Sequence, residues 1–237
     1  MTARPAKAPS EFLQPGVFVD SASEAVRAFS ETALRGVGGN GVARGVTLYY
    51  AVRDGLRYDP YGMVMTRDSF TASHISQRQA AFCIPKAILL TAAARAAGIP
   101  ARLGYADVRN HLCSPKLKAA MQGRDLFIYH GYVEMFLEGR WVKSTPAFNQ
   151  ELCDKVGIKT LEFNGRDDAL MHPYDREGRQ HMEYVRDHGT FADHPYERVR
   201  DAFIDMYGDL GERLAGLNGD FASEVAGDNT GDKNKAP

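Results

Sequence analysis

The sequence predicts an α+β fold in which one buried helix packs on a face of an antiparallel sheet. Three helical stretches come first in the chain, and segments with a period of two residues follow them. A run of helices followed by a run of strands is typical of α+β architecture. The third helix is apolar over most of its circumference, which predicts that it lies in the middle of the fold.

Apolar residues at helical spacing predict the first two helices, over 21–34 and 41–56. The third, over 82–97, has the sequence FCIPKAILLTAAARAA and is the strongest helix in the chain because it is dense in Ala and Leu. Pro85 stands near its start, where a missing N–H does no harm, and Gly98 follows its end.

Period-two patterns predict three strands after the third helix, over 101–108, 127–137 and 140–144. Glu138 and Gly139 form a tight turn between the last two strands, which therefore pair as a hairpin. A short helix over 114–121 is expected in the connection between the first two strands.

Composition limits the classes of function. The 237 residues carry a net charge of −1 and have a pI of about 6.7. Because the chain has no excess of basic residues, we do not expect it to bind nucleic acid or an anionic membrane. No stretch approaches the roughly 20 apolar residues of a membrane span, and the N-terminus lacks the apolar run of a signal peptide. The three cysteines, Cys83, Cys113 and Cys153, have no paired spacing, which favours a reducing compartment. We expect a cytoplasmic protein that needs no metal and no cofactor.

The expected organisation is one globular domain with two unstructured ends. Residues 1–10 form a disordered lead and 217–237 a disordered tail, the latter rich in Gly, Asp, Asn and Lys. Between them, 11–160 form the core and 161–216 an extension packed on the core. The position of the extension suggests that it shapes a substrate cleft.

Cys83 lies in the first turn of the predicted buried helix. The unpaired N–H groups and the positive end of the helix dipole stabilise a thiolate there, and can lower a thiol pKa from about 8.5 to between ~3.5 and ~7.5. The same N–H groups could hold the oxyanion of a tetrahedral intermediate. Position alone also fits a small buried thiol without reactivity, as most free cysteines are.

His130 lies beside Gly131 in the second predicted strand, which is expected to pack next to the start of the buried helix. A histidine beside a thiol can take its proton during attack and return it to the leaving amine. The neighbouring glycine leaves room for a substrate or for close approach of the backbone. Taken alone, a strand histidine is more often a half-buried packing residue.

Two ordered motifs resemble the bacterial transglutaminase-like superfamily. The first runs from Cys83 and Lys86 to Gly-Ile-Pro-Ala-Arg at 98–102, and the second is His-x-Tyr-Val-Glu-x-Phe-Leu-x-Gly-x-Trp-Val, starting at His130. With the lead-in YYAVRDGLRY, the resemblance covers about residues 40–149. It implies a papain-like α+β core with a Cys–His–Asp triad, in which Cys83 is the nucleophile and His130 the base.

The third member of that triad departs from the family pattern. The resemblance places an acid after the hairpin in Trp-x-x-x-Asp-Pro, and Thr145 stands at that position. A threonine hydroxyl can accept a hydrogen bond from the imidazole, but it supplies no negative charge to stabilise an imidazolium. Asn149 is an alternative, because an amide oxygen orients histidine in some cysteine proteases, and Asp107 could supply an acid from elsewhere in the chain.

Four further side chains are candidates for substrate or oxyanion binding. Asp107 and Asn110 belong to a polar segment that is either a binding loop at the mouth of the cleft or a hydrogen-bonded turn. Gln77 and Gln79 precede the cysteine closely and could donate to an oxyanion, although glutamine is usually exposed.

Several histidines fall among acidic residues in 161–199, which invites a metal interpretation. No pair has the spacing of metal ligands, so we expect surface or capping residues and no metal site. These histidines are His172, His181, His188 and His194.

The leading functional hypothesis is a cysteine enzyme that hydrolyses an amide or ester bond, or transfers the acyl group, through a thioester on Cys83. The expected substrate is a peptide, another amide or a small acyl compound, and analogy with the family favours water as the acceptor. Two alternatives remain open. A binding module could have kept the cleft and lost the triad, as Thr145 suggests, and a small-molecule acyltransferase would use the same thioester.

Overall fold

The described part of the molecule covers most of the chain. The computed structural model describes residues 10–110, 113–171, 174–178, 182–215, 217 and 220–231. The lead expected over 1–10 lies outside these ranges except for Ser10, which begins a 3-10 helix, η1 (Ser10–Leu13). Within these ranges, no helix is both long enough and apolar enough to cross a membrane.

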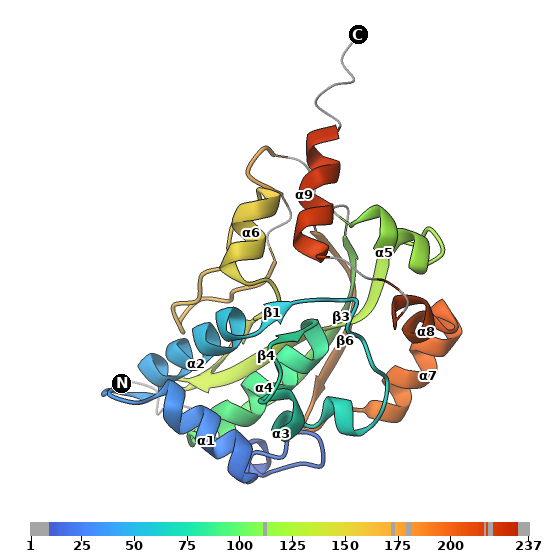
Figure 1. Cartoon of the computed structure of the whole chain (residues 1–237). Helices are drawn as coiled ribbons and strands as arrows, with labels where there is room; N and C mark the ends of the chain where they lie inside the picture. The colour runs from blue at the N-terminus through green and yellow to red at the C-terminus, as the bar shows by residue number, and fades with distance from the viewer. Residues whose placement is uncertain are drawn as a thin grey trace.

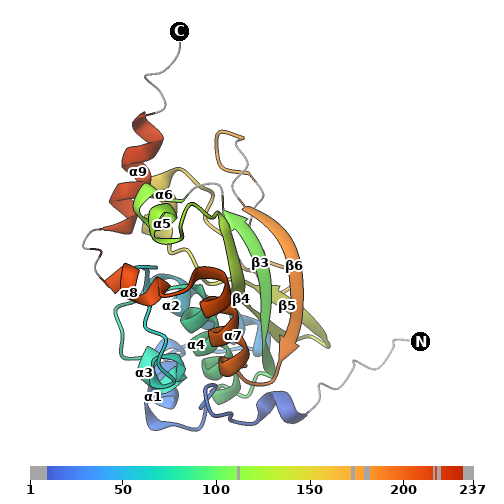
Figure 2. The ribbon, with the colours of Figure 1, turned by 90° about the vertical axis from the view of Figure 1, so that its right-hand side faces the viewer.

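A four-stranded antiparallel sheet forms one layer of the molecule (Figure 2). The three predicted strands are confirmed, and the turn at Glu138 and Gly139 joins two of them as a hairpin. The fourth strand, at one edge, is not predicted by the sequence pattern because apolar and polar residues alternate poorly along it. In order across the sheet the strands are β5 (Arg140–Ser144), β4 (Leu126–Leu137), β3 (Ala101–Asn110) and β6 (Met182–Phe191).

Helix α4 (Cys83–Ala96) packs on one face of this sheet (Figure 1). Every residue from Ile84 to Arg95 is buried, which confirms the predicted central helix and the α+β fold. Other helices pack against α4 and seal it from solvent, namely α1 (Glu24–Ala33), α2 (Gly41–Gly55), η2 (Asp68–Phe70) and α3 (Ala72–Ile75). A short parallel pair, β1 (Arg57–Tyr58) and β2 (Ala80–Ala81), leads the chain into Cys83.

The remaining helices come from the chain after β3. The predicted short helix over 114–121 is present as α5 (Pro115–Ala120). Helix α7 lies on the same side of the sheet as α4 and contacts β4 (Figure 2). The bounds of the other helices of this part are α6 (Gln150–Val156), α7 (Tyr196–Tyr207), α8 (Leu210–Ala215) and α9 (Phe221–Gly231).

Helix α9 lies where the sequence analysis expects a solvated tail. It contacts α5 and α6, and Phe221 and Val225, one helical turn apart, are buried. The ring of Phe221 packs against those of Tyr58 and Tyr61. This apolar pair at i and i+4, together with hydrogen bonds from Lys155 to Asp220 and from Tyr61 to Glu224, docks a segment whose composition is otherwise that of a tail.

Two buried cations on α4 bind carbonyl groups of other elements. Lys86 Nζ donates to Arg53 O at 2.7 Å and to Leu56 O at 2.6 Å, at the C-terminal end of α2. Burial lowers the pKa of Lys86 to about 7. The guanidinium of Arg95 donates to three carbonyls, those of Ala101 (2.9 Å), six residues away, and of Gln14 (2.7 Å) and Ala192 (2.6 Å), which are distant in sequence. Lys86 thus supplies donors to carbonyls at the end of α2, and Arg95 joins α4 to the start of β3 and to two loops.

Candidate active site

Cys83 is the first residue of α4, as expected, and it lines a small apolar cavity. The cavity has a volume of about 30 Å³, enough for roughly one or two water molecules. Tyr58 and Phe82 line it from the chain before α4, and Phe203 and Tyr207 line it from α7. Aromatic and aliphatic side chains together make its surface mostly apolar, which shields the thiol from bulk water.

The thiol of Cys83 is surrounded by backbone N–H groups, yet its pKa is raised. Burial raises the pKa of Cys83 from 9.0 to about 11 and outweighs the lowering by the N–H groups of Gly131 and Ile84 and of Cys83 itself, and by the charge of Lys86. The lowered pKa expected at a helix N-terminus is therefore wrong for this cysteine, because desolvation costs the anion more than the helix end returns. At neutral pH the resting thiol is protonated.

Gly131 brings β4 against the first turn of α4. A Cβ atom at this position would lie 3.0 Å from Ala87 Cβ, 3.2 Å from Cys83 O and 3.2 Å from Ile84 Cα. Since two of these atoms belong to the backbone, only glycine allows the two elements to approach this closely. The sequence-based expectation of a close backbone approach beside His130 is confirmed.

We therefore expect Gly131→Ala to lower the free energy of unfolding by about 1–3 kcal/mol, because the methyl group overpacks the contact. Urea denaturation measures this change. Gly55→Ala is the matched control, since it also adds one methyl group, at the end of α2, where no atom lies within 4 Å. The control is expected to be neutral or slightly stabilising, and equal losses in the two variants would contradict the role of the close contact.

His130 is buried, and its ring is neutral at pH 7. Burial lowers the pKa of His130 from 6.5 to about 4. Its Nε2 atom has no hydrogen-bond partner among the described residues, and within the same ranges no hydrogen bond joins the ring to the Cys83 thiol.

Strand β4 bulges immediately before His130. The β3–β4 register shifts between Ala106, which pairs with His130, and Val108, so that β4 carries one extra residue. Tyr129, in the bulge, has a φ of +54°, a conformation that a bulky residue adopts only when its surroundings impose it.

Asp107 and His188 hold this bulge. The Oδ1 atom of Asp107 accepts the N–H of Tyr129 at 3.0 Å and lies 2.6 Å from Nε2 of His188. The rings of Tyr129 and His188 stack at 4.1 Å, and Arg198 Nε on α7 donates to the Tyr129 hydroxyl at 3.0 Å. Asp107, proposed as an acid for His130, therefore contacts the residue before it and a different histidine.

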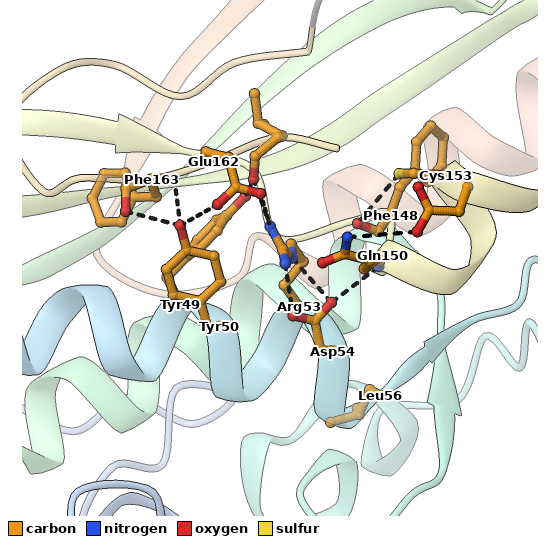
Figure 3. Close-up of polar contacts among 12 residues, drawn as sticks. Tyr49, Tyr50, Arg53, Asp54, Leu56, Phe148, Gln150, Cys153, Glu162 and Phe163 are labelled. Atoms are coloured by element: carbon orange, nitrogen blue, oxygen red, sulfur yellow. Dashed lines mark hydrogen bonds and ion pairs between the residues drawn. The ribbon is translucent and has the colours of Figure 1, made fainter. Parts of the chain in front are cut away.

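A polar cluster on α2 fixes the chain that follows β5 (Figure 3). Arg53 forms a two-fold ion pair with Asp54 and also donates to Leu161 O at 2.9 Å and to Glu162 at 3.2 Å. Asp54 in turn accepts the backbone N–H of Gln150 at 3.0 Å. Through these contacts α2 holds both ends of the segment between 150 and 162, next to the candidate third members of the triad.

Thr145 and Asn149 differ in what they bind. The amide oxygen of Asn149 accepts the N–H of Tyr58 at 3.0 Å, which fixes β1. Thr145 Oγ1 is buried without a hydrogen-bond partner among the described residues. It nevertheless lies close to the Tyr184 phenol. Burial raises the pKa of Tyr184, and the nearby Thr145 hydroxyl lowers that pKa by a smaller amount. Sequence reasoning missed Tyr184, because β6 brings it here from 39 positions further along the chain.

A family model and a solved structure match the chain. The model of the transglutaminase-like superfamily matches residues 28–146, half of the chain, including Cys83, His130 and Thr145. This chain belongs to the transglutaminase-like superfamily. No curated protein matches it. A crystal structure of a candidate cysteine protease from Cytophaga hutchinsonii shares 18% identity at a TM-score of 0.42, covering 57% of this chain and 40% of that protein.

The superfamily match ends at residue 146, so β6 and α7 lie outside it. These elements nevertheless carry Tyr184, His188 and Arg198, whose side chains contact the strand of His130 or the neighbourhood of Thr145. Residues beyond the match, on β6 and α7, therefore form part of the wall around the candidate site.

The other side chains predicted to bind substrate or the oxyanion are Gln77, Gln79 and Asn110. Gln77 is exposed, donates to Ser73 O at 3.5 Å and borders a hollow between α1 and α2, so the structure does not bring it to Cys83. Gln79 is also exposed. Asn110 is buried at the end of β3, where its N–H donates to Asp125 O.

The histidines considered as metal ligands have other surroundings. His194 Nδ1 lies 2.7 Å from the Tyr105 hydroxyl, and its ring stacks on Phe70. His172 and His181 lie outside the described residues. Within the described ranges, no group of three potential ligands converges on one point.

The neutral state of His130 predicts a loss of stability in acid. Its pKa is about 4 in the folded protein and 6.5 in an unfolded chain, so the unfolded state binds a proton first as the pH falls. The neutral ring therefore contributes about 3 kcal/mol to the free energy of unfolding above pH 6.5, and this contribution is lost as the pH falls to 4. Urea unfolding of the wild type and of His130→Gln at pH 7 and pH 4.5 measures it, and parallel pH dependences of the two proteins would contradict it.

Proposed function

We propose that this protein is a cysteine enzyme that cleaves an amide or ester bond through a thioester on Cys83. The observation that carries the proposal is the junction of α4 and β4. There the thiol at the start of the helix lies among backbone N–H groups, and Gly131 packs on the first turn with His130 directly before it. Membership of the transglutaminase-like superfamily, whose model spans both residues, supports the same assignment.

The raised pKa of Cys83 and the lowered pKa of His130 favour general-base catalysis over a resting ion pair. As the sulfur attacks the carbonyl carbon, the thiol proton passes to the imidazole and the carbonyl electrons form an oxyanion near the N–H groups. The bond to the leaving group then breaks, and the leaving group takes the proton from the imidazolium. Water next attacks the thioester, His130 accepts its proton, and the carboxylic acid and the free thiol are released.

The thiol and the imidazole must come within hydrogen-bond reach for this step, and catalytic contacts often tighten only when substrate binds. Thr145 is the residue that we propose to orient the ring, since its hydroxyl has no partner among the described residues, whereas Asn149 and Asp107 have other partners. The Tyr184 phenol, which also accepts the N–H of Met171, lies beside Thr145. The apolar lining of the cavity favours an apolar acyl group, and we propose a peptide, another amide or a small acyl compound as the substrate.

Trapping of the acyl group tests the proposal. On mixing with p-nitrophenyl acetate, we expect a burst of one nitrophenol per chain and an acetyl group on the peptide that contains Cys83, found by mass spectrometry. Cys83→Ala should lose both signals. Cys113→Ala and Cys153→Ala, which remove the other two free thiols, are the matched controls and should keep them. A burst of undiminished size in Cys83→Ala would refute the thioester.

A second candidate is a binding module that has kept the fold without turnover. The raised pKa of Cys83 and the threonine at position 145 favour it. In that case no ester or amide would acylate Cys83 at any pH between 6 and 9, whereas the enzyme hypothesis expects acylation throughout this range.

A further inference from the structure

A second hollow lies beyond the site, between the sheet and α7. Its volume is about 360 Å³, within the ~300–1,000 Å³ typical of small-molecule pockets. Asp107 and His188 line it from β3 and β6, together with the stacked ring of Tyr129, and Ala202 and Met206 line it from α7. Its position differs from that of the cavity at Cys83, with which it shares a single residue, Ile128.

Three guanidinium groups border this hollow, from three separate parts of the chain. Arg124 precedes β4, Arg186 lies on β6 and Arg198 lies on α7. Two carboxylates, those of Asp107 and Asp205, also line it, so its formal charge is positive. Asp107 already accepts a backbone N–H and contacts His188, which leaves it poorly placed to neutralise an arginine.

The arginines keep most of their donors free. Arg198 uses Nε on the Tyr129 hydroxyl, and Arg124 uses Nη1 on the side chain of Gln122. Arg186 is exposed on β6, and its guanidinium forms no hydrogen bond or ion pair within the described ranges. A guanidinium carries five N–H donors in a planar fork that fits a carboxylate or a phosphate, so three arginines with free donors around one hollow indicate an anionic ligand.

We propose that this hollow binds the carboxylate or phosphate group of a small molecule through Arg124, Arg186 and Arg198. The proposal is independent of the reaction at Cys83, because it rests on the charge and shape of the hollow alone. The hollow is nevertheless next to the site, since Tyr129 forms part of its wall and directly precedes His130.

Thermal unfolding and calorimetric titration of the full chain test the proposal, with inorganic phosphate and succinate as probes. We expect one of them or both to raise the Tm above that in sodium chloride of equal ionic strength. In Arg124→Gln/Arg186→Gln, we expect the Kd of that probe to weaken by about tenfold or more, as for the loss of charge-assisted hydrogen bonds. Comparison of the Tm values in chloride shows that the variant is folded.

Arg200→Gln is the matched control, because Arg200 lies on α7, is paired with Asp201 and does not line the hollow. The Arg200→Gln variant should bind the probe with the Kd of the wild type. A response to phosphate alone identifies a phosphoryl ligand, and a response to succinate alone a carboxylate. No response beyond that of chloride, or an equal loss in Arg200→Gln, would overturn the proposal.

Discussion

His130→Ala is expected to lower kcat/KM for p-nitrophenyl acetate by roughly 10³-fold, within the range measured for removal of a general base. The resting thiol is protonated, so the attack depends on a base to remove its proton more than it would in an enzyme with a preformed thiolate. The same reasoning sets the acid side of the pH profile. Because His130 must be neutral to act, activity should fall below pH 4–5 and not below 6.5.

Stopped-flow rates between pH 4 and 9 measure both effects. His74→Ala is the matched control, since His74 is exposed on α3, outside the residues that line the Cys83 cavity, and its loss should leave the rate unchanged. Wild-type activity in His130→Ala would show that another group takes the proton. An acid limb near 6.5 would show that His130 is more hydrated in the working enzyme than in this structure.

Lys86→Met is expected to lower the free energy of unfolding by about 2–4 kcal/mol. The substitution keeps the length of the side chain but removes the donors that Arg53 O and Leu56 O receive inside the protein. Each buried carbonyl left without a donor costs about 1–3 kcal/mol, and the loss is partly offset because a buried cation is removed as well. With a pKa of about 7, Lys86 is partly neutral at pH 7, and its amine still has two N–H bonds for the two carbonyls.

Urea denaturation monitored by circular dichroism measures this loss. Lys155→Met is the matched control, since Lys155 is partly exposed and its ion pair with Asp220 is solvated. Exposed pairs contribute up to about 1 kcal/mol, so the control should change little. A loss in Lys86→Met no larger than in Lys155→Met would mean that water or a backbone shift replaces the missing donors.

The elements that the sequence predicts are those with strong local patterns. Helix α4 is dense in Ala and Leu, and β3, β4 and β5 have clear period-two patterns ended by turn residues. Strand β6 reads MEYVRDHGTF and lies at a sheet edge with much of its length exposed, so no face of it is consistently apolar. Its pairing with β3 depends on residues far apart in the chain, and no local pattern encodes that pairing.

The same distinction holds within the candidate site. The positions of Cys83 at a helix start and of His130 on the next strand but one follow from the sequence. The contact of Asp107 with His188 joins residues 81 positions apart and arises only when β6 pairs with β3. The pKa of Cys83 shows the limit of local reasoning most clearly, because the helix end that lowers it is visible in the sequence and the apolar surroundings that raise it are not.

The three carbonyl contacts of Arg95 have a consequence for how the protein unfolds. Their acceptors belong to residues 14, 101 and 192, and two of these lie outside the half of the chain that the superfamily model matches. A fragment confined to residues 28–146 would leave the guanidinium buried with a single acceptor and would expose one edge of β3. We therefore expect that the matching half does not fold by itself and that the whole chain unfolds as one cooperative unit in a single transition.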